Sequence, residues 1–190
     1  MHPKRTTCIL YLTATCNLKC RYCFIDKSPI LKKIDEKLEQ SYKTNYYKNF
    51  IDEIFDDKEA LKRMEFWGGE PSYGLPRTYD TIKWVIENYP NFEEIMMSTN
   101  LTTKTVVEDL INFWKFLEQF SNRNFNFYLQ LSLDGPEYLN DYNRGKNTTK
   151  LFTENFKKLI DKIQDFNKNS NVKVHAHFKP TLANDTIAML

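Results

Sequence analysis

No stretch of this 190-residue sequence approaches the roughly 20 consecutive apolar residues that a membrane-spanning helix requires. The N-terminal stretch MHPKRTTCILYLTATC has a basic start, but its short apolar run is broken by threonines, so it does not match a secretory signal. Linkers rich in Pro, Gly or Ser and low-complexity tracts are also lacking. We therefore expect a cytoplasmic protein with no membrane segment, folded as one domain over residues 1–190.

The sequence also lacks an excess of either charge, with 27 Lys and Arg against 25 Asp and Glu and a formal net charge of +2. No basic run with interleaved aromatic residues is present, so the sequence predicts no binding to nucleic acid or to an anionic membrane. Hydrophobic residues make up 41% of the chain, which favours a packed globular core over disorder. Three of the four cysteines fall within eight residues, a clustering that argues against a disulfide framework and for a metal in a reducing compartment.

Segments with strand character alternate with segments of helical period along the chain. The strands are predicted at Cys8–Ala14, Arg63–Gly69, Glu93–Thr99, Asn126–Asp134 and Val172–Phe178. The helical apolar stripes are Leu38, Tyr42, Tyr46, Phe50 and Ile54 after an N-cap at Asp35, then Ile82–Tyr89, Val106–Leu117 and Phe152–Ile163. Repeated strand–helix alternation predicts an α/β fold of parallel strands joined by right-handed crossovers.

A closed eight-stranded α/β barrel takes about 250 residues, and five strands do not close one. We therefore expect an open, partial (β/α) barrel of about five β/α units, with outer helices and with the last strand at an edge. Asn184–Leu190 is predicted to open a further helix that stops in its first turns, so the domain is expected to be incomplete at its C-terminal end.

Polar or cysteine-rich motifs lie at the ends of four of the predicted strands. They are the loop CNLKCRYCF after the first strand, GGEP (Gly68–Pro71), STN (Ser98–Asn100) and SLDGP (Ser132–Pro136). In parallel α/β structures, ligands bind at the carboxyl ends of the strands. Four such motifs on one rim predict a cofactor site.

Cys16, Cys20 and Cys23 supply three thiolates from a C-x3-C-x2-C spacing. A structural zinc site needs a fourth ligand, whereas Cys8 lies on the preceding strand and His175 and His177 on the last. We expect Cys8 to be a small buried hydrophobic residue. The two histidines share one face of their strand, and we expect them to be partly buried or exposed strand residues; a role as substrate contacts or proton donors stays open. An iron–sulfur cubane takes one ligand per iron, so three cysteines leave one iron for a substrate or cofactor to chelate.

The segment CNLKCRYCF, with Tyr22 as its aromatic residue, resembles the signature of the radical S-adenosylmethionine superfamily, and GGEP at the next strand end strengthens the resemblance. The resemblance implies a 4Fe-4S cluster on the three cysteines, whose fourth iron is chelated by S-adenosylmethionine. Reductive cleavage of that cofactor gives a 5′-deoxyadenosyl radical, which abstracts hydrogen from a substrate. The expected protein is therefore a radical enzyme that contains these two cofactors.

Further residues are expected to contact the cofactor. The backbone carbonyls of Gly68 and Gly69 are able to approach a ligand closely, and the resemblance implies that this motif, with the negative charge of Glu70, contacts the methionine amino group. It also implies that Arg144 pairs with the carboxylate of S-adenosylmethionine, and a guanidinium suits that role because it binds carboxylates in a bidentate way.

Four short polar residues are candidates for binding ribose hydroxyls or substrate, with Ser132 the strongest; each also fits the simpler role of a turn former or helix cap. They are Ser98, Asn100, Ser132 and Asp134.

The stretch SLDGPEYLNDYNR (Ser132–Arg144) is similar to a motif of peptide- and protein-modifying radical enzymes of the SPASM type, including sulfatase maturases. This similarity implies a peptide or protein substrate and a reducing electron donor of the flavodoxin or ferredoxin type. A second chain that completes the barrel is a further expected partner. Two alternatives remain open: an activase that forms a glycyl radical on a partner protein, and a non-catalytic, truncated metal-binding fragment.

Overall fold

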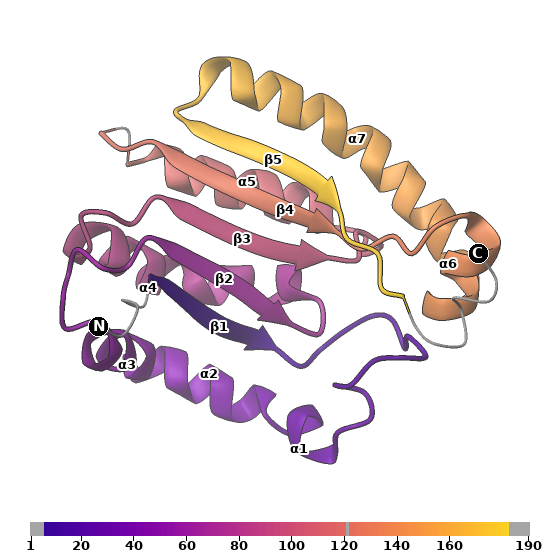
Figure 1. The fold of residues 1–190 in the computed structure, drawn as a ribbon, viewed down its shortest axis with the longest axis horizontal. Helices are drawn as coiled ribbons and strands as arrows, with labels where there is room; N and C mark the ends of the chain where they lie inside the picture. The colour runs from indigo at the N-terminus through magenta and orange to yellow at the C-terminus, as the bar shows by residue number, and fades with distance from the viewer. Residues whose placement is uncertain (1–5, 121, 183–190) are drawn as a thin grey trace.

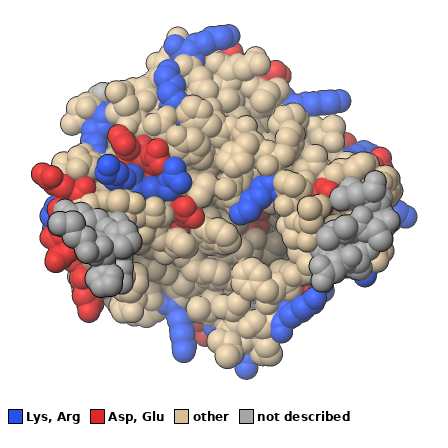
Figure 2. Space-filling view, viewed as in Figure 1, with Lys and Arg blue, Asp and Glu red and all other residues tan. Residues whose placement is uncertain are grey.

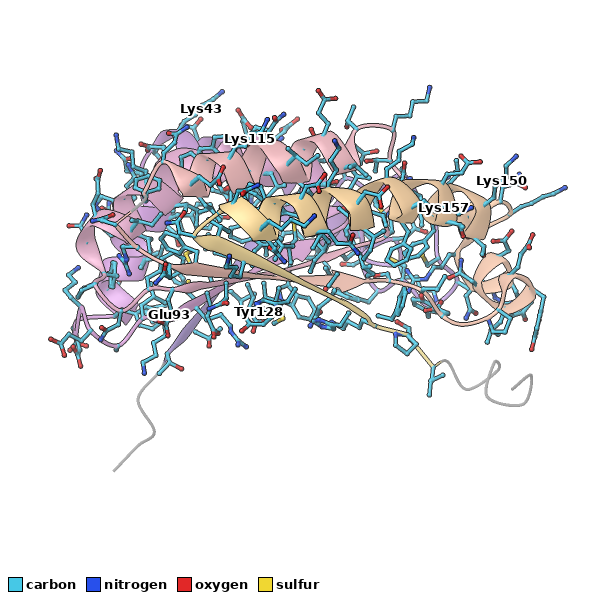
Figure 3. The ribbon with its side chains drawn as sticks, turned by 90° about the horizontal axis from the view of Figure 1, so that it is seen from above. Lys43, Glu93, Lys115, Tyr128, Lys150 and Lys157 are labelled. Carbon is cyan, nitrogen blue, oxygen red and sulfur yellow. The ribbon has the colours of Figure 1, made fainter. Side chains whose placement is uncertain are left out.

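Five parallel strands form a single sheet in the order β1-β2-β3-β4-β5, so each strand pairs with the next one in the sequence (Figure 1). The structure is a computed structural model that describes residues 6–120 and 122–182. Seen from the side, the longer helices lie against one face of the sheet, and Tyr128 lies on the opposite face (Figure 3). The predicted open, partial barrel of parallel strands with outer helices is confirmed.

The elements alternate as the sequence analysis predicts. The strands are β1 (Thr7–Thr13), β2 (Arg63–Gly68), β3 (Glu94–Thr99), β4 (Phe125–Leu131) and β5 (Val172–Phe178). The longer helices are α2 (Asp35–Lys43), α3 (Tyr46–Ile54), α4 (Leu75–Asn88), α5 (Val106–Glu118) and α7 (Thr148–Asn169). Shorter elements are α1 (Pro29–Lys32), the 3₁₀ turn η1 (Pro71–Gly74) and α6 (Glu137–Arg144).

Side chains alternate along each strand between a helix-covered face and an open face. In β4, Phe127 and Leu129 are buried under the helices, whereas Tyr128 and Gln130 on the other face are only half-buried. The core is rich in aromatic rings, since Phe113 of α5 packs against Phe127 with 5.7 Å between ring centroids. Burial of such rings dominates the stability of a core of this size.

One predicted helix is wrong in its extent. The stripe from Leu38 to Ile54 is divided between α2 and α3, because Asn45 adopts a left-handed conformation with φ of 58°. Residues four apart drift about 40° around a helix at each step, so a single helix would not keep all of this stripe on one face. The break at Asn45 lets α3 begin with a different rotation about its axis than a continued α2 would have, but Tyr46 still remains exposed.

Several boundaries and elements differ from the prediction. β4 ends at Leu131, so Ser132–Asp134 belong to the following loop, and α6 is a helix that the sequence analysis did not predict. The helix expected over Asn184–Leu190 lies outside the described residues. Within the part of the chain that the structure describes, no helix combines the length and the apolar character that crossing a membrane requires.

Asp35 is not the N-cap of α2; Ile34 occupies that position, and the Asp35 carboxylate reaches back to the end of β1. It accepts hydrogen bonds from the hydroxyl groups of Thr13 and Thr15, each at 2.9 Å, and from the N–H of Ala14 at 2.7 Å. Burial alone would raise the pKa of Asp35, but these hydrogen bonds outweigh it and lower the pKa below its ordinary value. Asp35 therefore fastens the start of the cysteine loop to the helical layer.

This attachment predicts a pH-dependent loss of stability in Asp35→Asn. Because the pKa of Asp35 is lower in the folded than in the unfolded chain, where it is about 3.9, its stabilisation is full at neutral pH and is lost as the pH falls through the folded value. Urea unfolding should show Asp35→Asn to be about 1–2 kcal/mol less stable than wild type at pH 7, with the difference narrowing below about pH 4. The exposed neighbour Glu36 supplies the control Glu36→Gln, and an equal loss in that variant would contradict the expectation.

Candidate active site

The carboxyl ends of the five strands point to one edge of the sheet, where the loop after β1 and helix α6 also lie (Figure 1). A cavity of about 450 Å³ opens there. Its lining is mostly apolar, with a few polar groups from the strand ends, which is the usual composition of a small-molecule site.

All the predicted site residues except Asp134 line this cavity. They are Cys16, Cys20, Tyr22, Cys23, Gly68, Gly69, Glu70, Ser98, Asn100, Ser132 and Arg144. The sequence analysis missed Trp67 and Lys179, which also line it. The rules applied to the other residues could have found both. Strand alternation places Trp67 on the open face, and Lys179 comes directly after the end of the fifth strand.

The three clustered cysteines share one cavity, and N–H donors approach two of their sulfur atoms. The Leu18 N–H lies 3.4 Å from Cys16 Sγ and the Asp26 N–H lies 3.4 Å from Cys23 Sγ. The side-chain amide of Asn100 adds a longer contact of 3.7 Å to Cys16 Sγ. Hydrogen bonds of this kind stabilise the cysteine sulfurs of iron–sulfur clusters, so the donor set fits such a group.

The surroundings of Cys16 and Cys20 do not favour bare thiolates, because burial raises the pKa of both thiols. Burial raises the pKa of Cys16 to about 11, and the neighbouring charges of Glu70, Cys20 and Cys23 add to this effect. A positive centre beside these two sulfurs would hold them in ionised form.

Among the described residues, no three His, Cys, Asp or Glu side chains are placed to hold a single metal ion. The closed zinc site of the alternative hypothesis thus has no preformed geometry in this part of the chain. In a four-iron cluster each thiolate binds a different iron, so the three ligands need to line one cavity rather than meet at one point.

Gly68 and Gly69 are required by the close approach of the turn after β2 to the end of β1. A Cβ on Gly68 would lie 2.3 Å from the carbonyl oxygen of Thr13, and one on Gly69 would lie 2.4 Å from that of Thr15. Gly68 also has a φ of +150°, which side chains disfavour. The expected approach of the glycine backbone to a ligand stays a prediction, whereas its approach to Thr13 and Thr15 is a direct reason for both glycines.

Glu70 is buried, and its carboxylate joins the loops after β2 and β3. Oε1 accepts hydrogen bonds from the Ser72 N–H at 3.2 Å and the Thr99 hydroxyl at 2.8 Å, while Oε2 accepts the Asn100 N–H at 2.7 Å. Burial raises the pKa of Glu70 despite these donors. Glu70 therefore holds the STN loop in place, in addition to any contact with a ligand.

Asp134 lies behind the cavity and gathers donors from three other segments. Arg144 binds it in a bidentate way, with Nε 3.0 Å from Oδ2 and Nη2 2.7 Å from Oδ1. The Tyr22 hydroxyl donates to Oδ2 at 2.7 Å, and the Thr181 N–H donates to Oδ1 at 2.9 Å. Each carboxylate oxygen therefore accepts two hydrogen bonds, which uses its ordinary acceptor capacity.

This network connects the cysteine loop to α6. Burial alone would lower the pKa of Arg144, but the hydrogen bonds to Asp134 and nearby negative groups raise it, so Arg144 stays charged. A bidentate bond occupies one edge of the guanidinium and leaves the Nη1 end available for a second anion. Arg144 also lines the cavity.

Three other candidate residues stand outside the cavity lining. Cys8 is buried on β1, where desolvation raises its pKa to about 11, as expected of a small hydrophobic residue. His175 and His177 are both exposed on β5, and His175 stacks on Tyr128 with 5.0 Å between ring centroids. The expectation that they are strand residues agrees with these positions.

The model of the Radical SAM superfamily matches residues 10–175, which is most of the chain. The chain belongs to this superfamily, whose members are enzymes that use S-adenosylmethionine and an iron–sulfur cluster. The prediction of the family is thereby confirmed, and with it the prediction of S-adenosylmethionine and an iron–sulfur cluster as cofactors.

One relative is a cysteine-type anaerobic sulfatase-maturating enzyme from Clostridium novyi (strain NT), 26% identical over 157 residues. The match covers 82% of this chain and 38% of that protein, so the chain spans well under half of the relative's length. A solved structure, native anSMEcpe with bound AdoMet, superposes with a TM-score of 0.58 at 20% identity, covering 96% of this chain and 46% of the other. The superposition supports the fold.

The network around Asp134 predicts an unequal pair of substitutions. Asp134→Asn should destabilise the protein by about 3 kcal/mol, because it leaves the buried guanidinium of Arg144 without its counter-charge. Tyr22→Phe removes one hydrogen bond to the same carboxylate and should cost about 1 kcal/mol in urea unfolding.

The matched control is Asp165→Asn, which breaks an exposed ion pair with Lys168 at 3.5 Å. It should change the free energy of unfolding by at most about 0.5 kcal/mol. If Asp134→Asn were no more harmful than this control, Asp134 would not have the structural role described here.

Proposed function

We propose that this chain is a radical S-adenosylmethionine enzyme in which Cys16, Cys20 and Cys23 hold a 4Fe-4S cluster and a peptide or protein side chain is the substrate. The observation that carries this proposal is that the three cysteines and the residues from the strand ends line one cavity. When bound, the cluster and S-adenosylmethionine supply a 5′-deoxyadenosyl radical that abstracts a hydrogen atom. The protein binds and orients these groups and shields them from water.

The residues around the cavity are proposed to have two roles: some contact the cofactor, and others hold these residues in position. Ser132, Tyr22 and the Nη1 end of Arg144 are proposed to contact S-adenosylmethionine, Arg144 at its carboxylate. The carbonyls of Gly68 and Gly69 are proposed to receive its amino group.

The second group consists of Glu70, Asn100 and Asp134, whose side chains already bond to neighbouring loops. We assign to them the positioning of the first group, and for Asp134 this replaces the proposed contact with ribose. Ser98, which donates to Gln130 Oε1 at 2.8 Å, lies at the substrate side of the cavity in this proposal.

A protein substrate is supported by the relative named as a sulfatase-maturating enzyme. We further propose a flavodoxin- or ferredoxin-type electron donor, because the radical reaction consumes an electron that the chain itself does not supply. A cytoplasmic location agrees with this reducing chemistry. A second chain that pairs with β5 would extend the sheet toward a fuller barrel.

Anaerobic reconstitution with iron and sulfide tests the proposal directly. The wild-type chain should take up about four irons. With dithionite and S-adenosylmethionine it should then form 5′-deoxyadenosine. Cys20→Ala should lose the cluster and the cleavage together, because the remaining two thiolates do not hold three irons of a cubane.

Cys8→Ala is the matched control, since Cys8 is buried outside the cavity; it should retain both the iron content and the cleavage. Tightly bound zinc with no 5′-deoxyadenosine would refute the enzyme and support the non-catalytic metal-binding alternative.

A further inference from the structure

On the open face of the sheet, a row of side chains extends from the cavity. Trp67 of β2, Ser98 of β3, Gln130 of β4 and Lys179 after β5 lie on it. Figure 2 looks onto this face and shows scattered Lys and Arg side chains, together with some Asp and Glu side chains, among mostly uncharged atoms. Three members of the row, Trp67, Ser98 and Lys179, also line the cavity with the cysteines.

Three charged side chains line the cavity, and they differ in how their charge is compensated. Arg144 forms a bidentate ion pair with buried Asp134. Glu70 accepts three hydrogen bonds. Among the described residues, no ion pair compensates Lys179, which therefore adds a positive charge to the cavity.

The ammonium group of Lys179 is held by neutral partners. Its Nζ donates to Gln130 Oε1 at 2.8 Å and lies 4.7 Å from the centroid of the Trp67 ring. Gln130 Oε1 also accepts the Ser98 hydroxyl at 2.8 Å. An amide oxygen and a ring face fix the position of a lysine cation without neutralising it. Within the described part of the chain, the hydrogen bond to Gln130 uses one of the three N–H donors of Lys179.

We infer that Lys179 anchors a carboxylate group of a molecule bound in this cavity. A fixed, uncompensated cation attracts an anion more strongly in a largely apolar cavity than in water. The molecule is either S-adenosylmethionine itself or the substrate. If Arg144 pairs with the cofactor's carboxylate, Lys179 selects a substrate that carries an acidic group. The inference rests on the proposed function only in that the cavity binds these ligands.

Calorimetric titration of the reconstituted protein tests the cofactor arm. Lys179→Gln keeps the length and polarity of the side chain but removes the charge, and the probes are S-adenosylmethionine and its decarboxylated form. If Lys179 holds the cofactor's carboxylate, the variant should bind S-adenosylmethionine about tenfold more weakly, with no change for the decarboxylated form.

The substrate arm uses protein already saturated with S-adenosylmethionine. The probes are two amidated dipeptides, N-acetyl-alanyl-aspartate and N-acetyl-alanyl-asparagine, which differ by one charge. If Lys179 holds a substrate carboxylate, wild type should prefer the aspartate peptide about tenfold, Lys179→Gln should lose the preference, and Lys179→Arg should retain it.

Lys173→Gln is the control. Lys173 lies on β5, the strand that Lys179 follows, but its Nζ donates to the carbonyls of Asn167 and Ser170, away from the cavity. Trp67→Phe is a second variant that weakens the support of Lys179 and should reduce the same preference in part. If wild type and Lys179→Gln bind each of the four probes with the same affinity, the inference is overturned. A protein that assembles no cluster and binds no S-adenosylmethionine would instead overturn the proposed function.

Discussion

Buried or half-buried carboxylates hold the loops of the cavity edge in place. Asp35 accepts the end of β1, Glu70 joins the turn after β2 to the STN loop, and Asp134 joins the cysteine loop to α6 and to the segment after β5. Each carboxylate accepts at least three hydrogen bonds, and these bonds replace the hydrogen bonds to water that its burial removes. The cavity is therefore shaped by loops that are bonded to one another as well as to the strands they follow.

The sequence predicted the sheet and most of the site because two simple rules apply here. Period-two alternation marks the strands, and parallel strands bring their carboxyl ends to one edge. The motifs around Cys16, Gly68, Ser98 and Ser132 each follow a strand, and so they meet at the cavity. The family followed from the spacing of the cysteines, a local feature that needs no tertiary structure.

The rest depends on contacts between distant segments. Tyr22 and Asp134 are 112 residues apart, and nothing near either one indicates that a hydroxyl and a carboxylate meet. Asp134 therefore looked like a ligand-binding residue, although its oxygens are occupied. The break at Asn45 depends on a backbone conformation that several residue types adopt. Lys179 follows a strand without a recognisable motif, and its significance lies in having no ion pair among the residues that the structure describes.

Trp67 lies in the cavity wall, 38% exposed, whereas Trp114 is fully buried in the core. Their indole emission should therefore differ, with the buried ring at shorter wavelength and the cavity ring sensitive to whatever enters beside it. Two of the three tryptophans thus act as optical reporters, Trp114 for the integrity of the core and Trp67 for occupancy of the cavity, and replacement of the third, Trp84, by Phe separates their signals.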